Sequence, residues 1–256
     1  MRVSEEHKHT YTARYVVIVL CMLFGLTEAG ARVPLPPTGP LDTTLLHAYL
    51  REEMQVWRTY IDTTCWETAD SVRRLQVLNY EYGFTAYMID SRPEEAAPYL
   101  NRFRSHIRSS EQLLTPARYA TYLSAAHAYT YRLNSTKVLS CAWRSYRLAH
   151  RAAETAPDDP LALTLLGNVY FYAPSLLGGD KQRALDCFNR ADSLMQTEPE
   201  SRLLWNYPAM RLCIAQCYEK TGDTAQAAAA YRELLRLYPD FLYVKTRVEE
   251  SGSIAR

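Results

Sequence analysis

The sequence predicts an all-α protein built from stacked antiparallel helix pairs. From Leu41 onward, apolar residues recur with the 3.6-residue period of a helix rather than the two-residue period of a strand. Segments with the same internal pattern also recur along the second half of the chain. We therefore expect about nine helices joined by short turns, at roughly 42–63, 67–89, 92–113, 116–133, 136–156, 160–173, 179–196, 200–220 and 224–238.

Helix boundaries are marked by capping residues and prolines. Thr115-Pro116 and Asp159-Pro160 each place an N-cap side chain before a proline in the first turn. Ser91 followed by Glu94 has the spacing of a capping box, which predicts a helix start at Ser91. Gly222-Asp223 predicts one helix end followed directly by a new cap.

Two segments repeat the same arrangement of small and large residues. In residues 208–241, the small residues Ala215 and Ala227 alternate with large aromatic ones before a terminal proline. In residues 160–199, Leu163-x2-Leu166-Gly167-x2-Tyr170 precedes Ala184-x3-Phe188 and a later proline. Small residues let two helices approach closely, and the large residues fill the space between them. Two looser copies lie upstream, so the pattern extends over residues 76–241.

These segments resemble tetratricopeptide (TPR) repeats, which implies a right-handed superhelix of antiparallel helix pairs. The chain is also similar to a group of exported bacterial TPR proteins. That likeness rests on the Tyr-x-Pro-x3-Gly-Gly-Asp loop at 172–180, Trp-Asn-Tyr at 205–207 and Pro-Asp-Phe at 239–241. The Gly-Gly-Asp loop also resembles one in the periplasmic TPR component of certain solute transporters. From its residues, we expect this loop to be a turn in which Asp180 caps the next helix.

The start of the chain indicates export. Residues 15–26 form an apolar run preceded by Lys8 and Arg14 and followed by Ala29-Gly30-Ala31, which fits signal-peptidase cleavage. As a helix the run would span about 18 Å, less than the ~30 Å of a bilayer core. We therefore expect a signal peptide at 1–31, a proline-rich linker at 32–40 and a helical domain at 41–256. The mature protein is expected in the periplasm or at the cell surface, without stable insertion in the membrane.

Composition and motifs argue against several function classes. A formal net charge of +1 does not favour a nucleic-acid binder, which needs a basic face. No Walker loop, G-x-S-x-G or H-E-x-x-H motif is present, so we expect neither an enzyme nor a metal or other cofactor. The five cysteines after residue 31 have no disulfide or zinc spacing and are interpreted as small hydrophobic residues.

The TPR resemblance implies a concave groove lined by the first helix of each pair. By that pattern we expect partner contacts from nine residues: His127, Tyr131, Thr164, Asn168, Phe171, Tyr172, Gln216, Glu219 and Lys220. Aromatic and amide groups there favour a protein or peptide partner, and hence a scaffold of the bacterial cell envelope. The alternative is a periplasmic carrier, or transporter-associated binder, of a small apolar ligand held between helices. An apolar cavity with several tyrosines would favour the carrier, and an open groove the scaffold.

Overall fold

The computed structural model describes residues 39–254, which form eleven α-helices and no strand. The expected signal peptide and all but the end of the linker lie outside the described residues. The helices are α2 (Pro40–Leu50), α3 (Met54–Thr63), α4 (Ser71–Ser91), α5 (Ala96–Ser109), α6 (Pro116–Leu133), α7 (Val138–Thr155), α8 (Pro160–Tyr172), α9 (Lys181–Gln196), α10 (Asn206–Thr221), α11 (Thr224–Leu237) and α12 (Leu242–Ile254). Between residues 39 and 254, no helix is long and apolar enough to cross a membrane.

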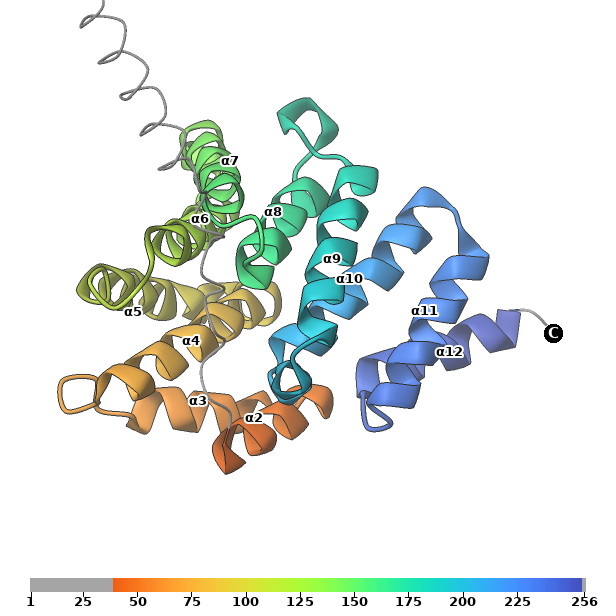
Figure 1. The fold of residues 1–256 in the computed structure, drawn as a ribbon, viewed down its shortest axis with the longest axis horizontal. Helices are drawn as coiled ribbons and strands as arrows, with labels where there is room; N and C mark the ends of the chain where they lie inside the picture. Colours follow the sequence, from red (N-terminus) through yellow and green to blue (C-terminus); the bar gives the residue numbers. More distant parts are fainter. Residues whose placement is uncertain (1–38, 255–256) are drawn as a thin grey trace, which may run out of the picture. The chain divides into compact units, whose positions relative to one another are not determined.

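Successive helices pack as pairs, which confirms the all-α, TPR-like repeat fold. The most extensive contacts join α6 to α7, α8 to α9 and α10 to α11 (Figure 1). Gly167 on α8 faces Phe188 on α9 so closely that a β-carbon there would lie 2.5 Å from the ring. One continuous core of buried residues runs from α2 to the start of α12, so the helical domain has a core of its own.

Most of the expected helix caps are confirmed. Thr115 and Asp159 accept hydrogen bonds from backbone amides in the first turns of α6 and α8. Gly178 has φ of 90°, in the left-handed region, and Asp180 then caps α9 through the amides of Gln182 and Arg183. Asp223 likewise caps α11. These side chains satisfy backbone N–H groups that a helix start leaves unpaired.

Four expectations about the helices were wrong. Ser91 is the last residue of α4 and caps no helix, because that helix continues past the position where we expected it to stop. The expected helix 42–63 is divided at residues 51–53, where Glu52 has φ of 60°. The last helix, α12, was not expected, and α2 begins at Pro40, inside the expected linker. There are therefore eleven helices among the described residues rather than nine.

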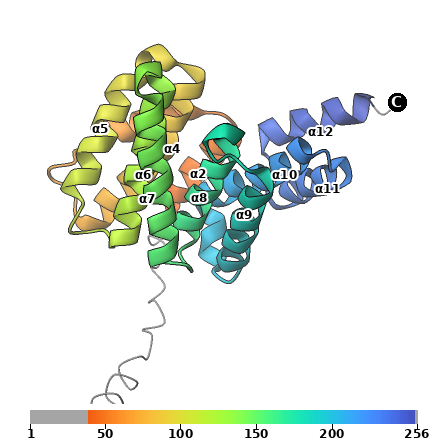
Figure 2. The same cartoon turned by 90° about the horizontal axis from the view of Figure 1, so that it is seen from above.

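The first helices pack against the last repeats and so close the array. Arg51, just after α2, forms an ion pair of 2.7 Å with Asp240, just before α12. Trp205, which precedes α10, lies with its ring centroid 5.4 Å from that of Trp57 on α3 and 5.6 Å from that of Tyr82 on α4. Within the helical domain, α5 and α12 lie at opposite ends, with α8 and α10 between them (Figure 2). These contacts narrow the groove on the inner face of the repeats to a partly open cavity.

Candidate ligand-binding cavity

The inner helices enclose a cavity of about 860 Å³. This volume is within the range of small-molecule sites, roughly 300–1,000 Å³. Its wall is mostly apolar and is rich in aromatic rings, which come from α2, α3, α4, α6, α7, α8 and α12 and from the residues just before α10 and α12. Eight tyrosines contribute, together with Trp57, Trp205 and Phe241: Tyr49, Tyr82, Tyr87, Tyr129, Tyr131, Tyr146, Tyr172 and Tyr243.

The aromatic wall depends on a close approach between α4 and two tryptophans. A β-carbon at Gly83 would lie 2.7 Å from the ring of Trp205 and 2.9 Å from that of Trp57. Only a residue without a side chain allows the two indoles to lie against the backbone of α4. Trp57 is held further by its indole N–H, which donates to the carbonyl of Leu45 at 2.7 Å. The cavity wall is therefore fixed by packing on both sides.

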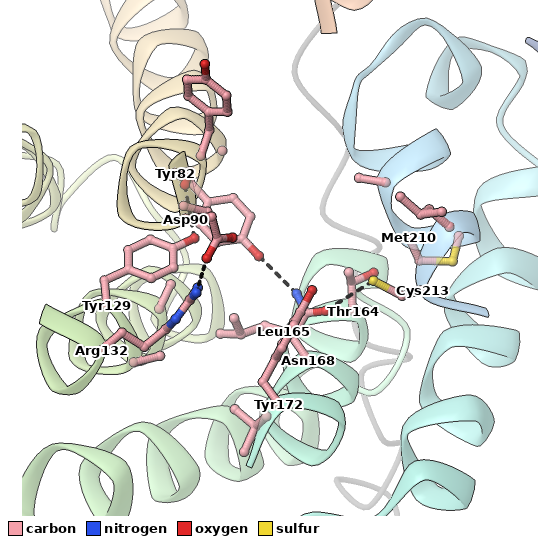
Figure 3. Close-up of a pocket in the computed structure, with 18 of the residues that line it drawn as sticks. Tyr82, Asp90, Tyr129, Arg132, Thr164, Leu165, Asn168, Tyr172, Met210 and Cys213 are labelled. Atoms are coloured by element: carbon pink, nitrogen blue, oxygen red, sulfur yellow. Dashed lines mark hydrogen bonds and ion pairs between the residues drawn. The ribbon is translucent and has the colours of Figure 1, made fainter. Parts of the chain in front are cut away.

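A short chain of hydrogen bonds crosses the cavity from α4 through α8 to α10 (Figure 3). The amide nitrogen of Asn168 donates to the hydroxyl oxygen of Tyr82 at 3.3 Å. The thiol of Cys213 donates to the amide oxygen of Asn168 at 3.8 Å. The hydroxyl of Tyr129 donates to the backbone carbonyl of Tyr82 at 3.0 Å. A small number of polar groups are thus held in fixed positions within apolar surroundings, as in sites that orient a mostly apolar ligand.

Burial keeps the thiol and phenol groups in this chain of hydrogen bonds neutral. It raises the pKa of the Cys213 thiol to about 12, with the nearby Cys217 adding to the shift. Burial likewise raises the pKa values of Tyr82 and Tyr129. Near pH 7 these groups are therefore a thiol and phenols, which exchange hydrogen bonds but are poor nucleophiles.

Charged groups occur at the rim of the cavity. Arg132 on α6 pairs with Asp90 at the end of α4, as Figure 3 shows. Glu52, in the strained corner between α2 and α3, also borders the cavity. Arg132 is the single cation among the lining residues that the structure describes. The rim of the cavity therefore has no strong positive charge.

Five of the nine residues expected to contact a partner line the cavity: Tyr131, Thr164, Asn168, Tyr172 and Gln216. Tyr172 is 57% exposed, the most accessible of the lining aromatic residues. The Thr164 hydroxyl is already engaged, since it donates to the carbonyl of Pro160 at 2.7 Å. Tyr131, Tyr172, Asn168 and Gln216 are thus the residues of this set with groups that a ligand could reach.

The structure places the other four elsewhere. Phe171 belongs to the core, where its ring packs at 4.9 Å from Tyr172 and carries the ammonium group of Lys181 on its face. Glu219 accepts a hydrogen bond from Tyr231 at 2.7 Å and pairs with Arg247. Lys220 is exposed near the end of α10, and His127 lies on the side of α6 that faces Arg104 and Arg144. These four residues do not line the cavity.

The most prominent wall residues, Trp57, Tyr82, Tyr129 and Trp205, were not among those expected. Tyr82 follows the helical period of a core residue, and Trp205 falls inside the expected helix 200–220, although in the structure it precedes α10. The only signal for them in the sequence is the excess of tyrosine, 20 against six phenylalanines, and the Trp-Asn-Tyr segment. Among the described residues, no group of three His, Cys, Asp or Glu side chains could hold a metal ion.

Comparisons with known proteins agree with the architecture. The tetratricopeptide repeat family matches residues 214–240, which cover the second half of α10 and all of α11. Among solved structures, the HusA haemophore from Porphyromonas gingivalis is similar at a TM-score of 0.51 and 19% sequence identity, over 72% of this chain and 96% of that one. At this identity the likeness concerns the fold. A search of curated proteins gave no match.

Proposed function

We propose that this chain, a helical protein of the TPR-like family, is a non-catalytic carrier of a flat, mostly apolar small molecule. The observation that carries the proposal is the aromatic-walled cavity of about 860 Å³, which is partly open to solvent. Flat rings stack well on aromatic side chains, whose conformations cost little entropy to fix. A pocket of this volume with walls of aromatic rings suits a small flat ligand better than an extended chain.

A tetrapyrrole ring fits this description best among common biological ligands. Such a ring is planar and apolar over both faces, and its polar groups lie at the edge. The likeness to a haemophore fold supports the same ligand class. In this proposal Tyr172 and Tyr82 offer ring surfaces, and Asn168 and Gln216 offer hydrogen bonds.

Export is part of the same proposal. A carrier acts where its ligand must cross an aqueous space, and the apolar run at 15–26 with Ala29-Gly30-Ala31 is the pattern of a cleaved signal. We therefore place the mature protein in the periplasm or at the cell surface. Mass spectrometry of the secreted form should find Arg32 at its N-terminus, and a retained Met1 would contradict cleavage.

A titration tests the carrier function. Haemin and metal-free protoporphyrin are added to the domain that begins at Arg32, and quenching of tryptophan emission is followed, because Trp57 and Trp205 lie in the cavity wall. We expect saturable one-to-one binding that weakens in Tyr172→Ala and is unchanged in Lys245→Ala, an exposed residue outside the cavity. Absence of saturable binding by either ring would overturn the proposal.

The second candidate is a scaffold for a protein or peptide. The TPR match at residues 214–240 favours it, because such repeats usually mediate protein interactions. A peptide library panned against the same domain separates the two functions. Peptide capture that Tyr172→Ala abolishes, without any ring binding, would favour the scaffold.

A further inference from the structure

The formal net charge of the chain is nearly zero, but the charged residues are unevenly distributed along it. Residues 96–155, which span α5 to α7, hold nine Lys or Arg residues and two Asp or Glu residues, although the whole chain has a formal charge of +1. Three of the nine cations, Arg102, Arg118 and Arg132, pair with carboxylates. The other six form no ion pair with any residue from 39 to 254: Arg104, Arg108, Lys137, Arg144, Arg147 and Arg151. This part of the domain is therefore an attractor for anions.

Exposed apolar residues adjoin these cations at the start of α7. Leu139 is 74% exposed and Trp143 is 60% exposed. Leu139, Trp143, Arg147 and Arg151 follow one another at intervals of four residues, so they form a single stripe along the helix. The stripe is apolar at the N-terminal end of α7 and cationic toward its C-terminal end. Nothing in the described domain covers it.

The connection between α8 and α9 adds to the apolar end of this stripe. Leu176, in the 3-10 turn Ser175–Leu177, is 99% exposed, and this connection projects beyond the helix ends in Figure 1. Tyr146 joins the two elements, because its ring stacks on Trp143 at 6.0 Å and would lie 3.2 Å from a β-carbon at Gly178. Trp143 and the turn that holds Leu176 thus lie on either side of Tyr146, and Leu139 is one turn before Trp143. We call the exposed residues Leu139, Trp143 and Leu176 the apolar rim.

This apolar rim borders the mouth of the cavity. Val138, Ala142 and Tyr146 of α7 and Leu177 of the turn line the cavity, and each is next to or one turn from a residue of the rim. The acidic residues of the mouth, Glu52 and Asp90, come from α2–α3 and α4, and Asp90 is neutralised by Arg132. The side of the mouth formed by α7 therefore combines apolar and cationic character.

We propose that this rim docks the protein on an anionic lipid bilayer. Tryptophan and leucine insert at the level between headgroups and acyl chains, and arginines a turn away reach lipid phosphates. Arg147 follows Trp143 by about 6 Å along the helix, a separation that suits an insertion depth of roughly 5–10 Å. A side chain as exposed as Leu176 suits a fluid interface, whereas a protein partner would need a pocket shaped for it. If the proposed carrier function holds, docking would bring the cavity mouth to the membrane.

The test is vesicle flotation of the ligand-free domain that begins at Arg32. This form is used because the apolar run at 15–26 would itself bind lipid, and the helical domain has its own core. Vesicles of phosphatidylglycerol with phosphatidylethanolamine are compared with phosphatidylcholine vesicles. We expect flotation with the anionic vesicles alone, and its loss at high salt. Because no ligand is added, failure here leaves the titration with ring compounds unaffected.

Two variants with matched controls locate the docking surface. Trp143→Ser should weaken binding to anionic vesicles about tenfold or more, and Arg147→Glu at least about fivefold, which corresponds to roughly 1 kcal/mol per cation near the surface. Val72→Ser, at an exposed apolar residue on α4, and Lys245→Glu, at an exposed cation on α12, should change binding little. All four positions are exposed, and far-UV circular dichroism verifies folding.

Failure of the parent protein to float with anionic vesicles would overturn the proposal. Equal binding by all four variants would overturn the assignment of the surface. If Trp143→Ser and Arg147→Glu instead abolished binding to an acidic protein while no vesicle bound, this surface would be a protein interface and the lipid proposal would be wrong.

Discussion

Asn79 and Asn206 exchange two hydrogen bonds across a separation of 127 residues, with nitrogen to oxygen distances of 2.9 and 3.0 Å. Both side chains are buried, and they join α4 to the first turn of α10. Asn206 also lines the cavity. Each amide satisfies the other, so the pair fixes the register between the first and last parts of the domain without leaving a polar group unpaired.

Breaking this pair on one side should cost more than replacing both partners. Asn79→Leu leaves the Asn206 amide buried without its partner, and we expect a loss of about 1–3 kcal/mol in the free energy of unfolding. Asn79→Leu with Asn206→Leu should lose less than the sum of the single losses. A double-mutant cycle by urea unfolding measures this coupling. Additive losses would show that the two amides do not act as a pair.

The neighbours Phe171 and Tyr172 should separate stability from binding. Phe171 is 8% exposed and packs in the core, so Phe171→Ala should destabilise the domain by about 3–5 kcal/mol. Tyr172 is 57% exposed at the cavity, so Tyr172→Ala should weaken binding of the ring ligand about tenfold with little loss of stability. Thermal unfolding and ligand titration of both variants provide the measurement. If Phe171→Ala weakened binding without a loss of stability, and Tyr172→Ala destabilised the domain, our assignment of the two faces of α8 would be wrong.

Phe171 and Tyr172 also show how much of the fold and of the site could be predicted from the sequence. The TPR pattern identified the pairing of helices and the close approach at Gly167, because small and large residues at fixed spacing determine local packing. The TPR pattern assigned both Phe171 and Tyr172 to the partner-binding face, because its groove positions are defined for an open array of repeats. The closure by Arg51 and Asp240 and by Trp205 involves residues far apart in the sequence. Such contacts have no periodic signal, so the cavity and most of its wall were unpredictable.

A larger residue at position 83 should disturb both the fold and the cavity wall. Gly83→Leu would force a side chain against the rings of Trp205 and Trp57. We expect a loss of about 1–3 kcal/mol in the free energy of unfolding, even though leucine favours a helix more than glycine does. Ala229→Leu, at an exposed position of α11, is the control and should be nearly neutral. Equal melting temperatures for Gly83→Leu and the parent would argue against the observed packing.

Stability should fall as the solution becomes acidic, in part through His127. Burial lowers the pKa of His127 below 6.5, and the nearby Arg144 and Arg104 lower it further. The unfolded chain therefore binds a proton on His127 more readily than the folded one as the pH falls through about 6.5. Full stability is present above that pH and is lost below it. His127→Gln should flatten the dependence of the urea midpoint on pH, whereas an unchanged slope would assign the effect elsewhere, for example to His150.

Metal-free protoporphyrin should bind nearly as tightly as haemin, because the carboxylates of Glu52 and Asp90 lie at the rim and the interior of the cavity offers no ready anionic ligand for iron. No histidine is among the described lining residues. Burial keeps the Cys213 thiol protonated by raising its pKa to about 12, and it keeps the phenol of Tyr82 protonated as well. Binding would then depend on ring surface, which the two compounds share, and their dissociation constants should agree within about threefold. Parallel titrations by tryptophan quenching measure both constants. A preference for haemin of tenfold or more that disappears in Cys213→Ser or Met210→Leu would instead show that a sulfur ligand in the cavity binds the iron.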